Sequence, residues 1–315
     1  MITIENLTKR YDSATVVDDV SLEIARHSIT VIVGTSGSGK STLLRMVNRL
    51  VEPSSGRVLL EGRDTRAEPA HLLRRRIGYV IQGYGLFPHR TVSENIATVP
   101  RLLNWDAARI RARVEELLRA FALEPADYAG KFPYQLSGGQ QQRVGVARAL
   151  AAEPAVLLMD EPFGALDPII RAKAQDDLLD IHRRFGTTIV LVTHDMDEAF
   201  RLGDHVAVMS AGRVLQYDRP AALITRPADP LVSRMTGLSD RALRLLSLIP
   251  AGEAALPGEM PGDAAAGAEV ASSATLRDVL SELLWRGVES ARVLDADGRT
   301  LGHLTVTAIL ARGRP

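Results

Sequence analysis

A glycine-rich octapeptide near the N-terminus of the chain restricts the possible folds more than any other segment. Residues 34–41 read Gly-Thr-Ser-Gly-Ser-Gly-Lys-Ser, which fits the phosphate-binding pattern G-x-x-x-x-G-K-[ST]. An apolar run, Ser28–Val33, precedes it and an amphipathic segment, Lys40–Leu50, follows it. Backbone N–H groups of such a loop surround phosphates at the positive end of a helix dipole. The context favours a nucleotide loop over a glycine-rich turn that binds nothing.

Nucleotide chemistry assigns roles to residues in this loop and to one acidic pair outside it. Lys40 is expected to contact the β- and γ-phosphates, and Ser41 to offer its hydroxyl to Mg²⁺. The apolar run Ala155–Met159 ends in Asp160 and Glu161, and a parallel strand delivers its last residues to the ligand-binding edge of a sheet. We therefore predict that Asp160 binds Mg²⁺ and that Glu161 polarises the attacking water. Without the loop, a helix cap or a salt bridge would explain the pair equally well.

The first 237 residues alternate short apolar runs with longer amphipathic segments. This pattern is typical of buried parallel strands with helices packed on the sheet, so it predicts an α/β domain. The predicted strands are Ser28–Val33, Ile77–Ile81, Val156–Met159 and Thr188–Val192, and the predicted helices are Lys40–Leu50, Ala107–Phe121, Gly138–Ala152 and Ile169–Phe185.

Composition argues against several classes of protein. The 38 basic and 38 acidic residues give a formal net charge of zero, which disfavours a nucleic-acid binder held by a basic surface. The absence of cysteine excludes disulfides and thiol chemistry. No apolar stretch approaches the ~20 residues that span a bilayer, and no leader is visible at the N-terminus. We therefore expect a cytoplasmic chain that reaches a membrane only through a partner.

The composition changes after Gly237. Residues Pro250–Ser273 are dense in Ala, Gly and Pro, which predicts a flexible linker, and Asp297-Gly298 predicts a hairpin turn. The elements expected after Gly237 are a helix at 240–249, a helix at 275–287, and strands at 291–295 and 300–304. The predicted domains are residues 1–237, a short helix and linker at 238–273, and a small α+β tail at 274–315.

The pentapeptide Leu136-Ser137-Gly138-Gly139-Gln140 selects one class among phosphate-loop proteins. With it, the chain resembles the ABC ATPases. The resemblance implies an α/β P-loop NTPase fold of ABC type, with a mixed-sheet core and a helical subdomain. Ser137 and the two glycines open a helix whose N-terminus is a second anion site. In the family this site serves ATP bound to the other subunit, so the resemblance implies a head-to-tail homodimer that closes on two ATP molecules.

The resemblance also assigns the remaining site residues by position. Tyr11 matches the aromatic that stacks on adenine, although an ordinary half-buried tyrosine would look the same. Asp167 matches the loop that bridges the protomers, and Gln82 and His194 match the residues that reach the attacking water and the γ-phosphate. The implied catalytic residues are Glu161, His194 and Gln82, and the implied Mg²⁺ ligands are Ser41, Gln82 and Asp160. The implied ATP contacts are Tyr11, Gly34, Thr35, Ser36, Gly37, Ser38, Gly39, Lys40, Ser41, Thr42, Ser137, Gly138, Gly139, Gln140 and Asp167.

Residues Gln82–His89 and Thr91–Asn95, with Pro100, Leu103 and Trp105, look like the quaternary-amine importer group of this family. The implied activity is ATP hydrolysis that drives import of glycine betaine, choline or carnitine across the inner membrane, on whose inner face the chain would be peripheral. The implied partners are transmembrane permease subunits and, indirectly, a substrate-binding protein, without nucleic acid. Polar amino acid import is the nearest alternative. An ABC ATPase that remodels nucleic-acid or ribosomal complexes is the alternative from another class.

The tail resembles a single CBS motif, and Asp240–Ile249 could be the remnant of a second copy. Nucleotide-binding CBS motifs place an aspartate three residues after a threonine to hold a ribose. Here Thr305 is followed at that spacing by Ala308. We therefore expect no tight adenosine-nucleotide binding by the tail. Dimerisation, a response to ionic strength, and a structural remnant stay open as its role.

Overall fold

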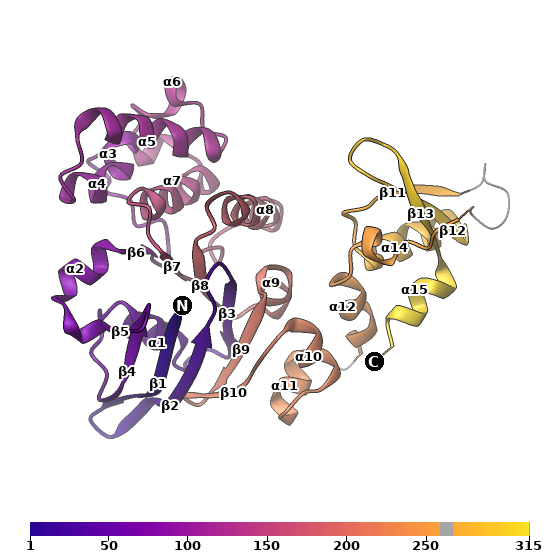
Figure 1. The fold of residues 1–315 in the computed structure, drawn as a ribbon, viewed down its shortest axis with the longest axis horizontal. Coiled ribbons are helices and arrows are strands. Elements are labelled where there is room, and N and C mark those ends of the chain that lie inside the picture. The colour runs from indigo at the N-terminus through magenta and orange to yellow at the C-terminus, as the bar shows by residue number, and fades with distance from the viewer. Residues whose placement is uncertain (238, 259–266, 315) are drawn as a thin grey trace. The chain divides into compact units, whose positions relative to one another are not determined.

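The computed structural model describes residues 1–237, 239–258 and 267–314. Contacts divide the chain into two compact units, Met1–Asp218 and Arg219–Pro315 (Figure 1). The division falls earlier than residue 237, because α10 (Pro220–Thr225) contacts both α11 (Pro230–Met235) and α12 (Arg241–Ser247). The helices of the second unit are α10 Pro220–Thr225, α11 Pro230–Met235, α12 Arg241–Ser247, α13 Ala251–Ala254, α14 Leu276–Arg286 and α15 Val306–Arg312.

A six-stranded sheet forms the centre of the first unit. Its strands, in spatial order, are β10 Arg213–Asp218, β9 His205–Ser210, β3 Ile29–Gly34, β8 Thr188–Thr193, β7 Val156–Asp160 and β6 Ile77–Val80. All neighbouring strands are parallel except the β9–β10 pair. Every residue of β3, β7 and β8 is buried, which explains why these strands are continuous apolar runs in the sequence. The four predicted strands are confirmed.

A second, antiparallel sheet packs against the first through α1. Its strands, in spatial order, are β2 Ala14–Ile24, β1 Ile2–Tyr11, β4 Ser55–Leu60 and β5 Arg63–Asp64. Leu43 and Leu44 of α1 (Lys40–Val47) are fully buried in one core with Ile4 of β1 and Ile32 of β3. This core holds α1, and with it the end of the glycine-rich loop, between the two sheets.

Helices fill the rest of the first unit. Between β6 and β7 the chain is helical, and α3 to α6 form a group apart from the sheets (Figure 1). These are the helices of the expected helical subdomain. The helices of the first unit after α1 are η1 Thr65–Ala67, α2 Ala70–Arg75, α3 Val92–Ile96, α4 Thr98–Leu102, α5 Ala107–Ala120, α6 Pro125–Tyr128, η2 Pro133–Gln135, α7 Gly138–Leu150, α8 Pro168–Phe185 and α9 Met196–Leu202.

The second unit contains a three-stranded sheet in the order β11 Ala268–Ala271, β12 Ser290–Leu294 and β13 Thr300–Thr305. The predicted hairpin at 291–304 is present, with β12 and β13 antiparallel. The helix α14 begins at a capping box on Thr275 and ends at Gly287, which adopts a left-handed conformation.

The structure corrects the flexible linker predicted at Pro250–Ser273. Part of this stretch is α13 and another part is β11, which pairs in parallel with β12. Ala251, Ala254 and Ala268 are buried in one core with leucines of α14. A stretch rich in small residues is typical of a linker, which is why the prediction was wrong. Here the small side chains instead allow α13, β11 and α14 to pack closely together. Residues 259–266 of the predicted linker lie outside the described residues.

None of the helices in the described part of the chain combines the length and the apolar character needed to cross a lipid bilayer.

Candidate nucleotide-binding site

The sheet brings the predicted site residues to one edge. In the parallel pairs, Val33 lies opposite Thr193, Asp160 opposite Val192, and Val80 opposite Met159. The carboxyl ends of β3, β6, β7 and β8 are therefore adjacent. The glycine-rich loop, the acidic pair and His194 all emerge there, and Gln82 follows β6 by two residues. Open α/β sheets bind ligands at this edge.

The glycine-rich loop requires glycine at two of its positions for steric reasons. Gly39 has φ +97°, and a Cβ atom there would lie 2.3 Å from the carbonyl oxygen of Val16. A Cβ atom on Gly34 would lie 2.1 Å from the carbonyl oxygen of Met209. Both distances are far below a normal contact, so only glycine fits. The tip of the loop at 35–37 is exposed, as a phosphate site must be.

Lys40 begins α1 and lies folded over the loop. Its Nζ atom donates to the carbonyl oxygens of Gly34 and Thr35, at 2.8 Å each. Burial lowers the pKa of Lys40, while the charges of Glu161 and Asp160 oppose this shift. Lys40 Nζ also donates to the Ser38 hydroxyl at 3.4 Å, so all three hydrogen-bond acceptors of this buried ammonium are neutral. An anion at this place would therefore make a stronger, charge-assisted hydrogen bond with Lys40.

Ser41 and Asp160 bring two side-chain oxygens together next to the loop. The Ser41 hydroxyl donates to Asp160 Oδ1 at 2.7 Å, and Arg45 lies 3.4 Å from Oδ2. No group of three or more His, Cys, Asp or Glu side chains suited to a metal occurs in the described residues. The pair matches Mg²⁺ nevertheless, because this ion takes few protein oxygens and completes its shell with water and phosphate oxygens.

Glu161 and His194 face each other beside this pair. His194 Nδ1 lies 3.5 Å from Glu161 Oε1, and the His194 side chain is 62% exposed. Glu161 has φ +45°, unusual for glutamate, and its N–H donates to the Val192 carbonyl at 3.0 Å. A cavity of about 20 Å³ lies against Glu161, His194 and Glu198, which is enough space for one water molecule. A carboxylate, an imidazole and room for a water can together support hydrolysis.

The signature pentapeptide forms the exposed start of α7. Ser137 is its N-cap, and Gln140 Oε1 accepts the Ser137 N–H at 2.9 Å in a capping box. Gln140 Nε2 donates to the Tyr128 hydroxyl at 3.1 Å. Gly138 lies so close to Tyr84 that an added Cβ atom would be 2.3 Å from its hydroxyl. The capping box pairs the N–H groups of Ser137 and Gln140, which leaves those of Gly138 and Gly139 without an intrahelical partner.

Three further predicted contacts, Tyr11, Gln82 and Asp167, are exposed, whereas Ser38 is buried and Thr42 is partly buried. Tyr11, at the end of β1, is 46% exposed, and Lys9 Nζ lies 4.7 Å from the centre of its ring. Gln82 is exposed in the loop after β6. Asp167 caps α8 by accepting the N–H groups of Ile169 and Ile170, at 3.1 and 3.0 Å. These side chains reach outward and would need a nucleotide or a second protomer to be covered.

The ABC transporter family model matches residues 17–164. The chain is 48% identical to the glycine betaine uptake system ATP-binding protein YehX of Escherichia coli (strain K12), over 96% of this chain and 97% of that protein. The chain belongs to the ABC transporter family. It is also 44% identical to the osmoprotectant import ATP-binding protein OsmV of Salmonella typhimurium (strain LT2), over 96% of this chain and 79% of that protein.

A solved ABC cassette has the same fold. The cassette MJ0796, in a dimeric post-hydrolysis state bound to ADP and Pi, is 34% identical. The alignment covers 70% of this chain and 99% of that cassette, with a TM-score of 0.62. The fold class predicted from the sequence is therefore confirmed for the ATPase part, while the CBS-like nature of the tail stays a prediction.

The structure of this ABC ATPase adds residues that the sequence interpretation missed. Arg45 lies one helical turn beyond Ser41 and faces Asp160, and its spacing along α1 was the available signal. Glu198 is buried behind His194, and its carboxylate accepts hydrogen bonds from Thr193 and Gln175. No local pattern marks Glu198, since helical acids are normally solvated.

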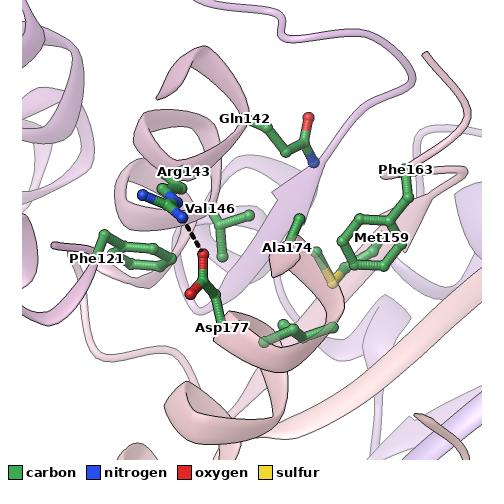
Figure 2. A pocket seen from close by; sticks show the side chains of 9 residues that line it. Phe121, Gln142, Arg143, Val146, Met159, Phe163, Ala174 and Asp177 are labelled. Atoms are coloured by element: carbon green, nitrogen blue, oxygen red, sulfur yellow. Dashed lines mark ion pairs between the residues drawn. The ribbon is translucent and has the colours of Figure 1, made fainter. Parts of the chain in front are cut away.

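A cavity between α7 and α8 of the ABC ATPase is not a nucleotide site (Figure 2). Arg143 of α7 forms an ion pair with Asp177 of α8 at 2.7 Å, and Phe163 and Met159 lie across from it. The cavity holds only about 10 Å³, so at most one water fits. The ion pair beside this cavity has a structural role, because it connects α7, which begins with the signature pentapeptide, to α8, which Asp167 caps.

Substituting Gly39 with alanine should destabilise the ABC ATPase and abolish nucleotide binding. The variant adds both a Cβ clash with Val16 and a strained positive φ, each costing about 1–3 kcal/mol. Gly37→Ala is the matched control, because Gly37 has φ +77° but open space around it. Thermal unfolding and ATP titration of both variants would check this. Equal melting temperatures would mean that the close approach to Val16 is unimportant.

Proposed function

We propose that this ABC ATPase hydrolyses ATP to energise the import of quaternary-amine osmoprotectants of the glycine betaine, choline and carnitine type. The proposed substrate class rests on one observation, the 48% identity to a glycine betaine uptake ATP-binding protein over nearly the full length of both chains. A similarity that continues through the second unit supports a shared transport system rather than a shared cassette alone. The transported substrate itself would not touch this subunit.

The phosphate groups of ATP would occupy the glycine-rich loop. Lys40 would exchange its contacts with the Gly34 and Thr35 carbonyls for the β- and γ-phosphates, gaining charged partners. Ser41 and Asp160, with Gln82 from the neighbouring loop, would hold Mg²⁺, which neutralises charge on the phosphates when bound. Tyr11 would stack on the adenine.

Hydrolysis would proceed by in-line attack of water on the γ-phosphate. Glu161 would accept the proton of this water, and His194 and Gln82 would orient it and contact the γ-phosphate. The 3.5 Å separation of His194 Nδ1 and Glu161 Oε1 supports a shared task at one position.

A second protomer would complete each site. Gly138 and Gly139 present N–H groups without an intrahelical partner at the start of α7, next to the Ser137 hydroxyl, which suits a γ-phosphate held by another copy. Asp167 would contact the partner across the same interface. The dimeric state of a solved relative supports this arrangement. Permease subunits would anchor the dimer peripherally at the inner face of the membrane, and a substrate-binding protein would deliver the substrate to them.

An uptake assay tests the proposed substrate. Cells lacking this subunit should lose import of labelled glycine betaine, choline or carnitine, and the wild-type gene should restore it. The same gene with Lys40→Ala is the matched control and should not restore import. Loss of labelled polar amino acid import, with quaternary-amine import unchanged, would contradict the proposal.

The second unit should be dispensable for basal ATP hydrolysis. Every residue assigned to nucleotide chemistry lies before Gly203, and the first unit ends at Asp218 with its own core. We therefore expect a chain that ends at Asp218 to retain ATPase activity within about twofold of the full chain. The roles open to the second unit are then dimerisation, a response of transport to ionic strength, or that of a structural remnant. A loss of ATPase activity in a truncated chain that still folds would contradict this expectation.

A further inference from the structure

A buried carboxylate next to the site has no task in the chemistry proposed so far. Glu198, in α9, is 6% exposed, and burial raises the pKa of its carboxyl group. Thr193 Oγ1 donates to its Oε2 atom, and Gln175 Nε2 donates to its Oε1 atom at 3.3 Å. Thr193 and Gln175 are also buried. Burying a carboxylate costs several kcal/mol even when it is hydrogen-bonded, so stability alone does not account for it.

Glu198 belongs to a network of hydrogen bonds that reaches the main chain next to His194. Thr193 precedes His194, and its hydroxyl oxygen also accepts the N–H of Asp195 at 3.1 Å. Asp195 Oδ1 then accepts the N–H groups of Asp197 and Glu198, at 2.9 and 3.2 Å. Hydrogen bonds thus link Thr193, Asp195 and Glu198 into a closed ring, and His194 lies in the segment that this ring holds.

The acceptor character of Glu198 matters for this ring. The Thr193 hydroxyl carries one hydrogen, and giving it to a carboxylate oxygen leaves the hydroxyl lone pairs for the Asp195 N–H. The His194 side chain, in contrast, is 62% exposed. The imidazole can therefore rotate about its own bonds, while its backbone stays in place.

We infer that Glu198 is a positioning residue that, through Thr193, holds the backbone of His194 where the imidazole reaches the γ-phosphate. This inference rests on the role proposed above for His194. Gln175 extends the network to α8, the helix that Asp167 begins, and accepts a hydrogen bond from Arg201 at 3.1 Å. The carboxylate of Glu198 thereby connects the His194 loop to α8.

Two valine substitutions in β8 test the inference. Thr193→Val keeps the shape of the side chain and removes the hydroxyl that bridges Glu198 and Asp195. Thr188→Val is the matched control at the other end of β8, because Thr188 is 3% exposed, against 2% for Thr193, and accepts the N–H of His27 at 3.0 Å. Misplacement of a reacting group by 1 Å can cost ~10²-fold. We expect Thr193→Val to lower kcat for ATP about 10- to 100-fold with KM little changed, and Thr188→Val to keep kcat near wild type.

An exchange of the two partners separates positioning from packing. Glu198→Gln keeps the volume but sets an amide N–H₂ against that of Gln175, so we expect about a tenfold loss of kcat. In the double variant with Gln175→Glu, the carboxylate and the amide change places and Thr193 keeps an acceptor. Arg201, which already pairs with Asp176 at 2.7 Å, gains a second charged partner. We expect this double variant to recover most of the lost kcat, which general damage to the core would not allow.

The full-length protein is assayed throughout, with His194→Ala as the reference. If His194→Ala keeps wild-type kcat, the role proposed for His194 is wrong and the inference falls with it. If His194→Ala loses activity while folded Thr193→Val and Glu198→Gln chains keep wild-type kcat, only the inference about Glu198 is overturned. Thr193→Val and Thr188→Val losing kcat equally would also overturn it.

Discussion

Replacing Glu161 with glutamine should abolish ATP turnover while ATP binding stays intact. Glutamine keeps the size of the side chain and its contact distance to His194 but cannot accept a proton from water. The loss of a general base costs ~10²-fold or more in rate. Because binding and dimer closure precede the chemical step, the variant should accumulate as a dimer with two trapped ATP molecules. Steady-state hydrolysis, with size-exclusion chromatography in the presence of ATP, measures both effects.

The control for this variant is Glu153→Gln. Glu153 also adopts a positive φ, of +55° against +45° for Glu161, but it lies after α7 in an exposed ion pair with Arg109. Glu153→Gln should hydrolyse ATP at close to the wild-type rate. Near wild-type hydrolysis by purified Glu161→Gln would remove Glu161 from the role of general base.

Ser137→Arg should block hydrolysis although the P-loop stays intact. A bulky cation at the exposed start of α7 would keep that helix from approaching a γ-phosphate bound by the partner. Loss of the transition-state contacts at both composite sites should reduce the rate ~10²-fold or more. Ser137→Ala is the milder comparison, because it removes only the N-cap hydroxyl, whose loss typically costs about 1 kcal/mol of helix stability.

Mixing Ser137→Arg with Lys40→Ala chains tests the shared-site arrangement. In a mixed dimer both lesions fall on the same composite site, and the other site combines an intact Lys40 with an intact Ser137. ATP-dependent dimers should therefore form in the mixture beyond those of each variant alone, as light scattering would detect. No gain on mixing would mean that each site lies within one chain, contrary to the proposed head-to-tail dimer.

Much of the nucleotide site could be predicted because its motifs are short and local. The sequence around Lys40 requires a strand, a glycine loop and a helix in immediate succession, and that order is what the structure has. The strand that ends at Asp160 is apolar throughout because it is buried on both faces. Parallel strands place their carboxyl ends together, so the acidic pair could be assigned to the same edge as the loop without coordinates.

The tail shows where local composition misled the prediction. Ala268 and its neighbours carry no pattern of a strand, yet β11 forms because β12 and α14 supply a sheet edge and a core to cover it. Alanine, being small, suits a flexible linker and a tightly packed core equally well, and only the neighbours decide between them.

The sequence by itself determined the strand–loop–helix order, the acidic pair and the signature pentapeptide, since each depends on residues adjacent along the chain. Only the tertiary structure decided which distant side chains meet. It placed His194 against Glu161, Arg45 against Asp160, and Glu198 behind Thr193. The physical reason is that such contacts depend on how separate elements pack, and packing is set by the shapes of all neighbours together rather than by a repeating pattern in one segment.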